Sequence, residues 1–390
     1  MYYFCVMISR KAADYITSLS RHFPVLFITG PRQSGKTTLV RELFKDLPYV
    51  LLELPDQRRL AQEDPRTFLM KYPTGAILDE VQNVPDLFSY LQGVVDENRS
   101  VNFVLTGSQN FLLNEKISQS LAGRAGVVTL LPLTLQELKD TRQSSFEDWI
   151  FKGFYPELHN RNVPPDLFYP SYVQTYLERD VRSLQNVGNL ALFNLFLKLC
   201  AGRVGQVLNV SAVAAEAGIS VNTAKAWLSV LEASYIIYRL QPHYKNFNKR
   251  LVKSPKLYFI DTGLASHLLG IKDGEQLRTH YALGALFENF VVMECYKQRL
   301  NQGKRDGLYY WKDNKGMEVD LLVEEGMTFR AYEIKAGRTA NSEYFKNLKY
   351  WSKLSGRMPE DCTVIYGGDL NQSTAYGQLR SWKELLDYFL

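Results

Sequence analysis

The sequence has few cysteines, and it lacks long apolar runs, low-complexity segments and internal repeats. Its 390 residues include four cysteines, which are far apart: Cys5, Cys200, Cys295 and Cys362. This spacing supports neither a zinc knuckle nor a disulfide framework, so we expect a reducing compartment. No stretch approaches the roughly 20 apolar residues of a membrane span, and the first residues lack the order of a signal peptide. We therefore expect a cytoplasmic protein without a membrane partner.

The composition is that of an ordinary globular protein, with 46% hydrophobic and 22% charged residues. This excludes a disordered, collagen-like or coiled-coil chain. The 46 basic and 41 acidic residues give a net charge of +5. Such a mild excess neither requires nor excludes nucleic acid, so partners must be argued from local patches. At roughly 150 residues per domain, the length suggests two or three domains.

The order of apolar runs predicts an α/β fold at the start of the chain. Up to about residue 135, short apolar runs at 25–29, 49–54, 75–78, 101–106 and 126–131 alternate with helical segments. Alternation of this kind is typical of a parallel sheet with helices on both faces. We expect domains at 1–135 (the α/β core), 136–200 (helical), 201–270 (two short helices and a hairpin) and 271–390 (a long helix, then strands).

Residues 30–37 read Gly-Pro-Arg-Gln-Ser-Gly-Lys-Thr and match the phosphate-binding loop at every fixed position. The loop follows an apolar strand and precedes a helical segment, as this motif requires. Main-chain N–H groups of the loop and the helix start can hold a triphosphate. Lys36 would neutralise the β- and γ-phosphates, and the Thr37 hydroxyl would bind Mg²⁺. The residues expected at the nucleotide are Gly30, Pro31, Arg32, Gln33, Ser34, Gly35, Lys36, Thr37 and Thr38.

Two later strands end in polar residues that suit the same site. Residues 76–80 read Ala-Ile-Leu-Asp-Glu, in which Asp79 suits a Mg²⁺-holding role and Glu80 suits the base that polarises the attacking water. A solvated turn is the alternative. After strand 101–106, Ser108 or Asn110 would sense the γ-phosphate or hold the water; a simple polar cap of the strand is the alternative.

Arg124 stands just before the last expected strand of this core. It is a candidate γ-phosphate contact, either within its own chain or across an interface with a second copy. A surface arginine in an ion pair explains the residue equally well.

Together these pieces resemble the AAA+ ATPases, in particular a prokaryotic group whose C-terminal half is a domain of unknown function. The later segments that carry the resemblance are Gly153-Phe-Tyr-Pro-Glu157, Tyr176-Leu-Glu-Arg-Asp180, Tyr258-Phe-Ile-Asp-Thr-Gly263 and Leu286-Phe-Glu-Asn289. The resemblance implies a P-loop ATPase core with sheet order 5-1-4-3-2 that uses ATP and Mg²⁺. AAA+ relatives often form rings, which leaves a homo-oligomer open.

Residues 211–232 read as helix, glycine turn at Gly218, helix, as in a winged helix. Residues 241–260 follow with five bases and no acid, interleaved with aromatics: Lys245, Lys249, Arg250, Lys253 and Lys256, with Tyr244, Phe247 and Tyr258. Such a wing would contact nucleic-acid phosphates. At the second helix, only Ser220, Asn222, Thr223 and Lys225 could contact the edges of DNA bases. These side chains are a poor set for distinguishing one base sequence from another. We favour DNA as partner, with RNA and a protein-binding role left open.

Residues 317–335 predict a β-hairpin with its turn at 326–327. Pairing of residue 325 with 328 places Asp320 opposite Glu333, and Lys335 shares the face of Glu333. Two carboxylates and a lysine on one face can hold a second divalent ion and activate water beside it.

This hairpin resembles the core of PD-(D/E)xK restriction endonucleases, to which a helical acid, here Glu288, is usually added. The resemblance makes Glu288, Asp320 and Glu333 metal ligands, while Lys335 would orient the nucleophile or stabilise developing charge. A salt-bridged sheet surface and an inactive nuclease fold are the alternatives. The sequence therefore predicts an ATPase that drives a nucleic-acid-binding, cleaving module; the alternative is an ATP-gated binding or regulatory protein.

Overall fold

The computed structural model describes residues 8–108, 120–138, 144–177, 189–243, 252–304 and 307–385. The chain forms two compact units. The first is the chain up to Leu133 with Ala233–Tyr235 and Leu300–Gly303, and the second is the remainder from Thr134. No helix within these described ranges combines the length and the apolar character needed to cross a membrane. The finer division of the second unit into three domains stays a prediction.

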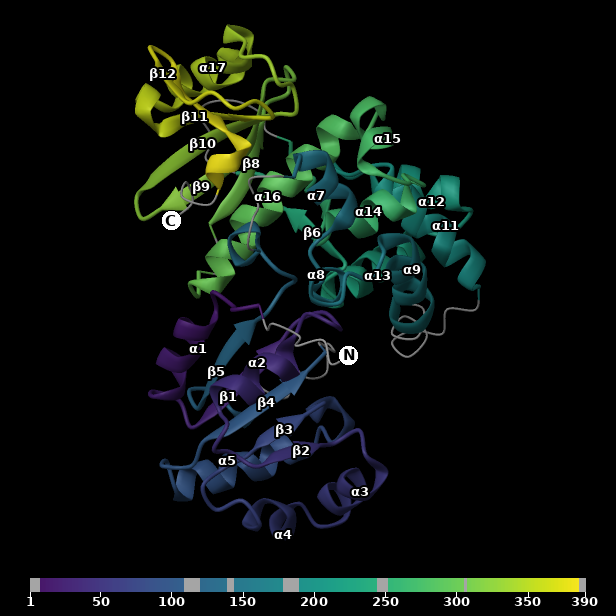
Figure 1. The fold of residues 1–390 in the computed structure, drawn as a ribbon, viewed down its shortest axis with the longest axis vertical. Helices are drawn as coiled ribbons and strands as arrows, with labels where there is room; N and C mark the ends of the chain where they lie inside the picture. The colour runs from purple at the N-terminus through teal and green to yellow at the C-terminus, as the bar shows by residue number, and fades with distance from the viewer. Residues whose placement is uncertain are drawn as a thin grey trace. The chain divides into compact units, whose positions relative to one another are not determined.

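The first unit is built on a parallel five-stranded sheet in the order β2-β3-β4-β1-β5 (Figure 1). This is the order that the resemblance implies, and it is confirmed. On either side of β1, Val25 pairs with Phe103 of β4 and with Ala125 of β5. The strands are β1 (Val25–Thr29), β2 (Tyr49–Leu51), β3 (Ile77–Asp79), β4 (Phe103–Gly107) and β5 (Ala125–Thr129).

Helices cover both faces of this sheet, as expected. Since side chains alternate along a strand, Val25 and Phe27 of β1 face one core, with residues of α3, α4 and α5. Leu26 and Ile28 face the other core, with residues of α1 and α2. The helices are α1 (Ala13–Ser20), α2 (Lys36–Leu43), α3 (Pro55–Glu63), α4 (Pro65–Met70) and α5 (Leu87–Glu97), with the short 3₁₀ helix η1 (Val81–Asn83).

The second unit contains helices that precede its C-terminal sheet in the chain and are interrupted by a two-stranded ribbon. They are α7 (Phe146–Lys152), α8 (Pro156–Asn160), α9 (Pro165–Tyr172), α11 (Leu190–Ala201), α12 (Val210–Ala217), α13 (Val221–Ala233), α14 (Thr262–Leu268), α15 (Gly274–Thr279) and α16 (Leu283–Asn301). Helices α12 and α13 flank Gly218, which is left-handed at φ 67° and ends α12. An antiparallel ribbon of β6 (Ile237–Leu240) and β7 (Lys256–Phe259) follows. The helix-turn-helix and hairpin expected here are present, while the winged-helix assignment stays a prediction.

A mixed sheet in the order β12-β13-β11-β10-β9-β8 completes this unit (Figure 1). Its strands are β8 (Leu308–Lys312), β9 (Glu318–Glu325), β10 (Thr328–Lys335), β11 (Cys362–Tyr366), β12 (Gln372–Thr374) and β13 (Gly377–Ser381), and α17 (Lys346–Ser355) packs on it. In the β9–β10 hairpin Glu325 lies opposite Thr328, and the pairing runs on to Leu321 and Tyr332. The expected hairpin register is therefore confirmed.

Candidate functional site

The phosphate-binding loop lies between β1 and α2, and its shape depends on two glycines. Gly30 has φ +149°, and a Cβ built on it would come within 2.1 Å of the main-chain oxygen of Leu130. Gly35 is left-handed, with φ 89°, where α2 begins. A side chain at position 30 would collide with backbone rather than with a movable side chain, so only glycine fits this close approach.

Two buried cations hold the main chain of this loop. The Lys36 ammonium donates to the oxygens of Gly30 at 3.1 Å and Pro31 at 2.8 Å. The Arg10 guanidinium donates at 2.7 Å to the oxygen of Ser34 and at 2.7 Å to that of Leu131. Sequence analysis missed Arg10, because no local pattern links a residue before α1 to the loop. The arginine ties the loop to the segment that follows β5.

Asp79 is a buried side chain at the end of β3, next to the start of α2. Its carboxylate accepts hydrogen bonds from the Thr37 hydroxyl at 2.9 Å and from the Tyr49 hydroxyl at 2.6 Å, and a further one from Thr106. Burial and the bond to Asp79 raise the pKa of Tyr49 well above its ordinary value. The structure thus brings together Thr37 and Asp79, the two residues predicted to hold Mg²⁺.

The loop suits a magnesium–nucleotide. Gln33 and Gly35 have positive φ angles of 61° and 89°, and left-handed residues within a loop help its N–H groups converge on an anion. The hydroxyl of Ser34 is buried without a hydrogen-bond partner among the described residues. A hydroxyl beside a buried carboxylate is the donor set with which P-loop proteins hold Mg²⁺. The residues present therefore fit both the phosphates and the ion.

Glu80 follows Asp79 in a left-handed conformation, φ 58°. Its carboxylate accepts a hydrogen bond from the side-chain amide of Gln82, which also contacts the hydroxyl of Ser108 at 3.3 Å. Gln82, which sequence analysis missed, therefore links two of the predicted site residues. Asn110, the alternative to Ser108, lies outside the described residues.

Arg124 does not join this site within its own chain. Its guanidinium makes a paired contact with Asp96, at 2.6 and 2.8 Å. Arg124 directly precedes β5, whose first residue pairs with Val25 at the start of β1, whereas the phosphate loop follows the other end of β1. The predicted contact with the γ-phosphate of the same chain is therefore wrong, and the structure shows the ion pair instead. A contact with a second copy stays a prediction.

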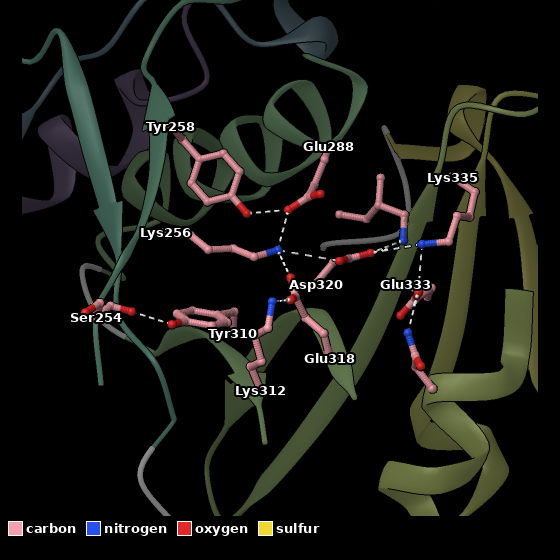
Figure 2. Close-up of polar contacts among 12 residues, drawn as sticks. Ser254, Lys256, Tyr258, Glu288, Tyr310, Lys312, Glu318, Asp320, Glu333 and Lys335 are labelled. Carbon is pink, nitrogen blue, oxygen red and sulfur yellow. Dashed lines mark hydrogen bonds and ion pairs between the residues drawn. The ribbon is translucent and has the colours of Figure 1, made fainter. Parts of the chain in front are cut away.

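A second constellation lies in the other unit, where the predicted nuclease-type residues do come together (Figure 2). The Lys335 ammonium lies 2.7 Å from the Glu333 carboxylate and 3.6 Å from that of Asp320. Glu288 of α16 faces the same cluster and accepts a 2.6 Å hydrogen bond from the Tyr258 hydroxyl. We call these residues, with Lys256, Lys312 and Glu318, the carboxylate cluster.

Lys256 was expected in a basic strip that contacts nucleic-acid phosphates, and for this residue the expectation is wrong. Its side chain is only 2% exposed, and its ammonium lies 2.8 Å from Glu288, with Glu318 also in contact. The lysine is therefore buried among carboxylates, where it cannot reach a nucleic-acid phosphate. Of the other bases in the strip, Lys253 is exposed, and the rest lie outside the described residues.

Burial sets the ionisation of the carboxylate cluster. It raises the pKa of Glu333 from 4.5 to about 8, with help from Asp320 and against the effect of Lys335. It raises the pKa of Glu288 from 4.5 to about 7, although Lys256 opposes the shift. Burial alone would lower the pKa of Lys256, but Glu288, Asp320 and Glu318 raise it well above its ordinary value, so the lysine is charged at neutral pH.

Two of the later segments that carry the family resemblance, 153–157 and 258–263, hold helices of the second unit together. The carboxylate of Asp261 accepts hydrogen bonds from the Phe154 N–H at 2.7 Å and the Tyr169 hydroxyl at 2.6 Å. A Cβ on Gly153 would meet that hydroxyl at 1.9 Å. These contacts join α7, α9 and α14. The side chains of segment 176–180 lie outside the described residues.

Comparison with known families divides the chain into three parts. Residues 22–139 match a model described as an AAA domain. Residues 143–275 and 283–384 match two models described as domains of unknown function, DUF8612 and DUF4143. The first unit is thus a P-loop AAA domain, and its match supports ATP binding.

Relatives cover nearly the whole chain. Uncharacterized proteins of Mycobacterium tuberculosis and Mycobacterium bovis are each 31% identical over 371 residues, covering 94% of this chain and 81% of their own. An uncharacterized protein of Haemophilus influenzae is 21% identical over 337 residues, 77% of this chain and 82% of its own. Among solved structures, a Walker-type ATPase of Pyrococcus abyssi is 16% identical with a TM-score of 0.46, covering 67% of this chain and 96% of its own.

Proposed function

Because the chain belongs to the same family as the two mycobacterial proteins and carries an AAA domain, we propose that it is a Mg²⁺-dependent ATPase that gates a C-terminal binding module. The observation that carries the ATPase proposal is the 2.9 Å hydrogen bond from the Thr37 hydroxyl to Asp79. It joins the end of the phosphate loop to the carboxylate at the end of β3, the pair of groups with which P-loop proteins hold Mg²⁺.

Each residue of this site has a distinct role in the proposal. Lys36 leaves the oxygens of Gly30 and Pro31 to neutralise the β- and γ-phosphates. Thr37 and Asp79 hold the ion; when bound, Mg²⁺ neutralises charge on the phosphate oxygens. Glu80, released from Gln82, accepts a proton from the attacking water.

Steady-state ATP hydrolysis with Mg²⁺ tests this proposal. Lys36→Ala should abolish tight ATP binding and turnover, since the loop loses the ammonium that would neutralise the β- and γ-phosphates. Lys45→Ala is the matched control, because Lys45 is an exposed lysine paired with Glu42 at 2.8 Å. Turnover by Lys36→Ala at the parent rate would refute the phosphate-loop assignment.

For the C-terminal module we propose DNA binding controlled by the nucleotide. The supporting features are the helix-turn-helix of α12 and α13 and the exposed bases Lys225 and Lys253. Anisotropy of labelled duplex DNA should show binding that weakens with salt and changes on adding ADP or a non-hydrolysable ATP analogue. Lys225→Ala/Lys253→Ala should weaken binding, whereas Lys346→Ala, at an exposed site on α17, should not. Equal DNA binding by the parent chain, Lys225→Ala/Lys253→Ala and Lys346→Ala would argue against a DNA-binding surface at Lys225 and Lys253.

Nucleic-acid cleavage is a second candidate function, favoured by the convergence of Asp320, Glu333 and Lys335. It is tested by incubating labelled single- and double-stranded DNA and RNA with Mg²⁺ or Mn²⁺, with and without ATP. Cutting that disappears in Asp320→Ala/Lys335→Ala would support a nuclease. Intact substrates beside measurable ATP hydrolysis would leave the ATP-gated binding protein as the function.

A further inference from the structure

The carboxylate cluster contains a cation of its own. Lys256 is the first residue of β7, and its ammonium meets acids from two other elements (Figure 2). These are Glu288 of α16, at 2.8 Å, and Glu318 and Asp320 of β9, the latter at 3.6 Å. With 2% of its side chain exposed, the lysine is as deeply buried as an ordinary core residue.

Asp320, the central predicted ligand, lies between two ammoniums. Its Oδ1 faces Lys256 at 3.6 Å and its Oδ2 faces Lys335 at 3.6 Å, while Oδ2 also accepts the N–H of Ile334 at 2.9 Å. Lys335 is shared with Glu333. The acids predicted to be metal ligands are thus divided between two lysines: Glu288 and Asp320 face Lys256, whereas Glu333 faces Lys335.

This arrangement does not fit the divalent ion that the nuclease resemblance implies. A divalent ion needs several oxygens converging on one point at about 2.0–2.6 Å. In the described part of the chain, no group of three or more His, Cys, Asp or Glu residues is arranged to hold a metal. An ion placed among Glu288, Glu318 and Asp320 would also meet the positive charge of Lys256, which repels it.

We infer that the Lys256 ammonium occupies the cation position of this cluster and closes it to divalent metals. The lysine then acts as an internal ion-pair lock that ties the β6–β7 ribbon to α16 and β9. Lys256→Met removes the ammonium and keeps most of the side-chain length, so Glu288, Glu318 and Asp320 can take a divalent cation in place of the ammonium. The inference is independent of the ATPase proposal, and it separates the gated binding protein from the cleavage candidate.

Binding of Mn²⁺ without nucleotide tests the inference. All five tryptophans follow residue 148 and belong to the second unit, so their fluorescence during thermal unfolding reports this unit and not the phosphate loop. Mn²⁺ should leave the Tm of the parent chain unchanged and raise that of Lys256→Met, because a ligand that binds the folded state stabilises it. Isothermal titration should show saturable Mn²⁺ binding by Lys256→Met that the parent chain lacks.

The matched control is Lys312→Met. Lys312 contacts Glu318 at 2.5 Å from the edge of the cluster, with 31% of its side chain exposed. Its replacement removes the same charge and leaves Lys256 in place, so it should not create Mn²⁺ binding. Adding Asp320→Asn to Lys256→Met should abolish the gained binding.

Lys256→Met leaves buried acids without their cation and can fail to fold. Lys256→Met/Glu318→Gln removes one acid together with the base and preserves the net charge, so it supplies a second variant for the same titration. Mn²⁺ binding by the parent that Asp320→Asn abolishes would overturn the inference. If a folded Lys256 variant did not bind Mn²⁺, the inference would be overturned as well, because the lysine ammonium would then not occupy a site that a divalent cation can take.

Discussion

The guanidinium of Arg10 donates a 2.7 Å hydrogen bond to the main-chain oxygen of Ser34, in the middle of the phosphate loop. All peptide bonds in the described chain are trans, so the carbonyl of Ser34 and the N–H of Gly35 point in opposite directions within one plane. By holding the carbonyl, Arg10 directs the Gly35 N–H to the other side of the loop. A residue 24 positions upstream therefore sets the direction of a donor at the start of α2.

Arg10→Met should raise the KM for ATP by about tenfold, the effect of losing about 1.4 kcal/mol of binding. Arg10→Lys should recover only part of the affinity, because an ammonium lacks the planar fork that reaches Ser34 and Leu131 together. Steady-state kinetics over a range of ATP concentrations measures both, with Arg21→Met, an exposed arginine after α1, as control. An unchanged KM in Arg10→Met, or a fall in kcat alone, would contradict this positioning role.

Gly30→Ala should weaken the first unit and its nucleotide site. The new Cβ would meet the Leu130 oxygen at 2.1 Å, at a φ of +149° that other residues rarely adopt. Backbone strain of this kind costs about 1–3 kcal/mol. Protection against proteolysis by Mg²⁺ and ATP is a suitable measurement, with Gly93→Ala as control because a Cβ there meets no atom within 4 Å. Parent-like protection in Gly30→Ala would be unexpected.

Glu80→Gln should bind ATP normally and hydrolyse it slowly. Loss of a positioned base typically lowers the rate by roughly 10²–10⁴-fold, while the groups that hold the phosphates are unaffected. Fluorescent-nucleotide binding and phosphate release measured on the same sample separate the two effects. Glu63→Gln, at an exposed site on α3, should behave like the parent, and normal turnover by Glu80→Gln would remove Glu80 from the role of base.

The second unit should lose stability as the pH rises from about 4.5 to 8. Burial raises the pKa of Glu288 to about 7 and of Glu333 to about 8, from 4.5. The folded state therefore binds more protons than the unfolded state in this window, and the free energy of unfolding falls as these protons are lost. The charged groups facing the two acids are Lys256, Lys335 and Asp320.

Urea unfolding followed by tryptophan fluorescence measures this dependence. Each carboxyl contributes at most about 1.4 kcal/mol per pH unit. Glu333→Gln should flatten the fall, because a neutral amide has no proton to lose, whereas Glu343→Gln, at an exposed site, should leave it unchanged. A stability that rises over this window, or an equal slope in Glu333→Gln, would show that Glu333 does not titrate in this way.

Much of the architecture follows from local sequence. The loop at residues 30–37 combines two glycines with a lysine and a threonine at fixed spacing, and its apolar flanks specify the strand and the helix beside it. The β9–β10 register follows from a short turn, because a two-residue connection leaves little freedom in the pairing. The ends of strands were predicted less accurately. The apolar run at 49–54 was expected to form one strand, but β2 ends at Leu51, shortly before α3 begins.

The amino-acid sequence by itself determined the nucleotide loop, the alternation of strands and helices, and the hairpin that carries Asp320 and Glu333. Only the tertiary structure decided which charges meet. It buried Lys256 among acids, paired Arg124 with Asp96 and brought Arg10 to the loop. The reason is physical: periodicity and turns act between neighbouring residues, whereas a buried charge must find its partner wherever packing brings one, often on a segment far away in the chain.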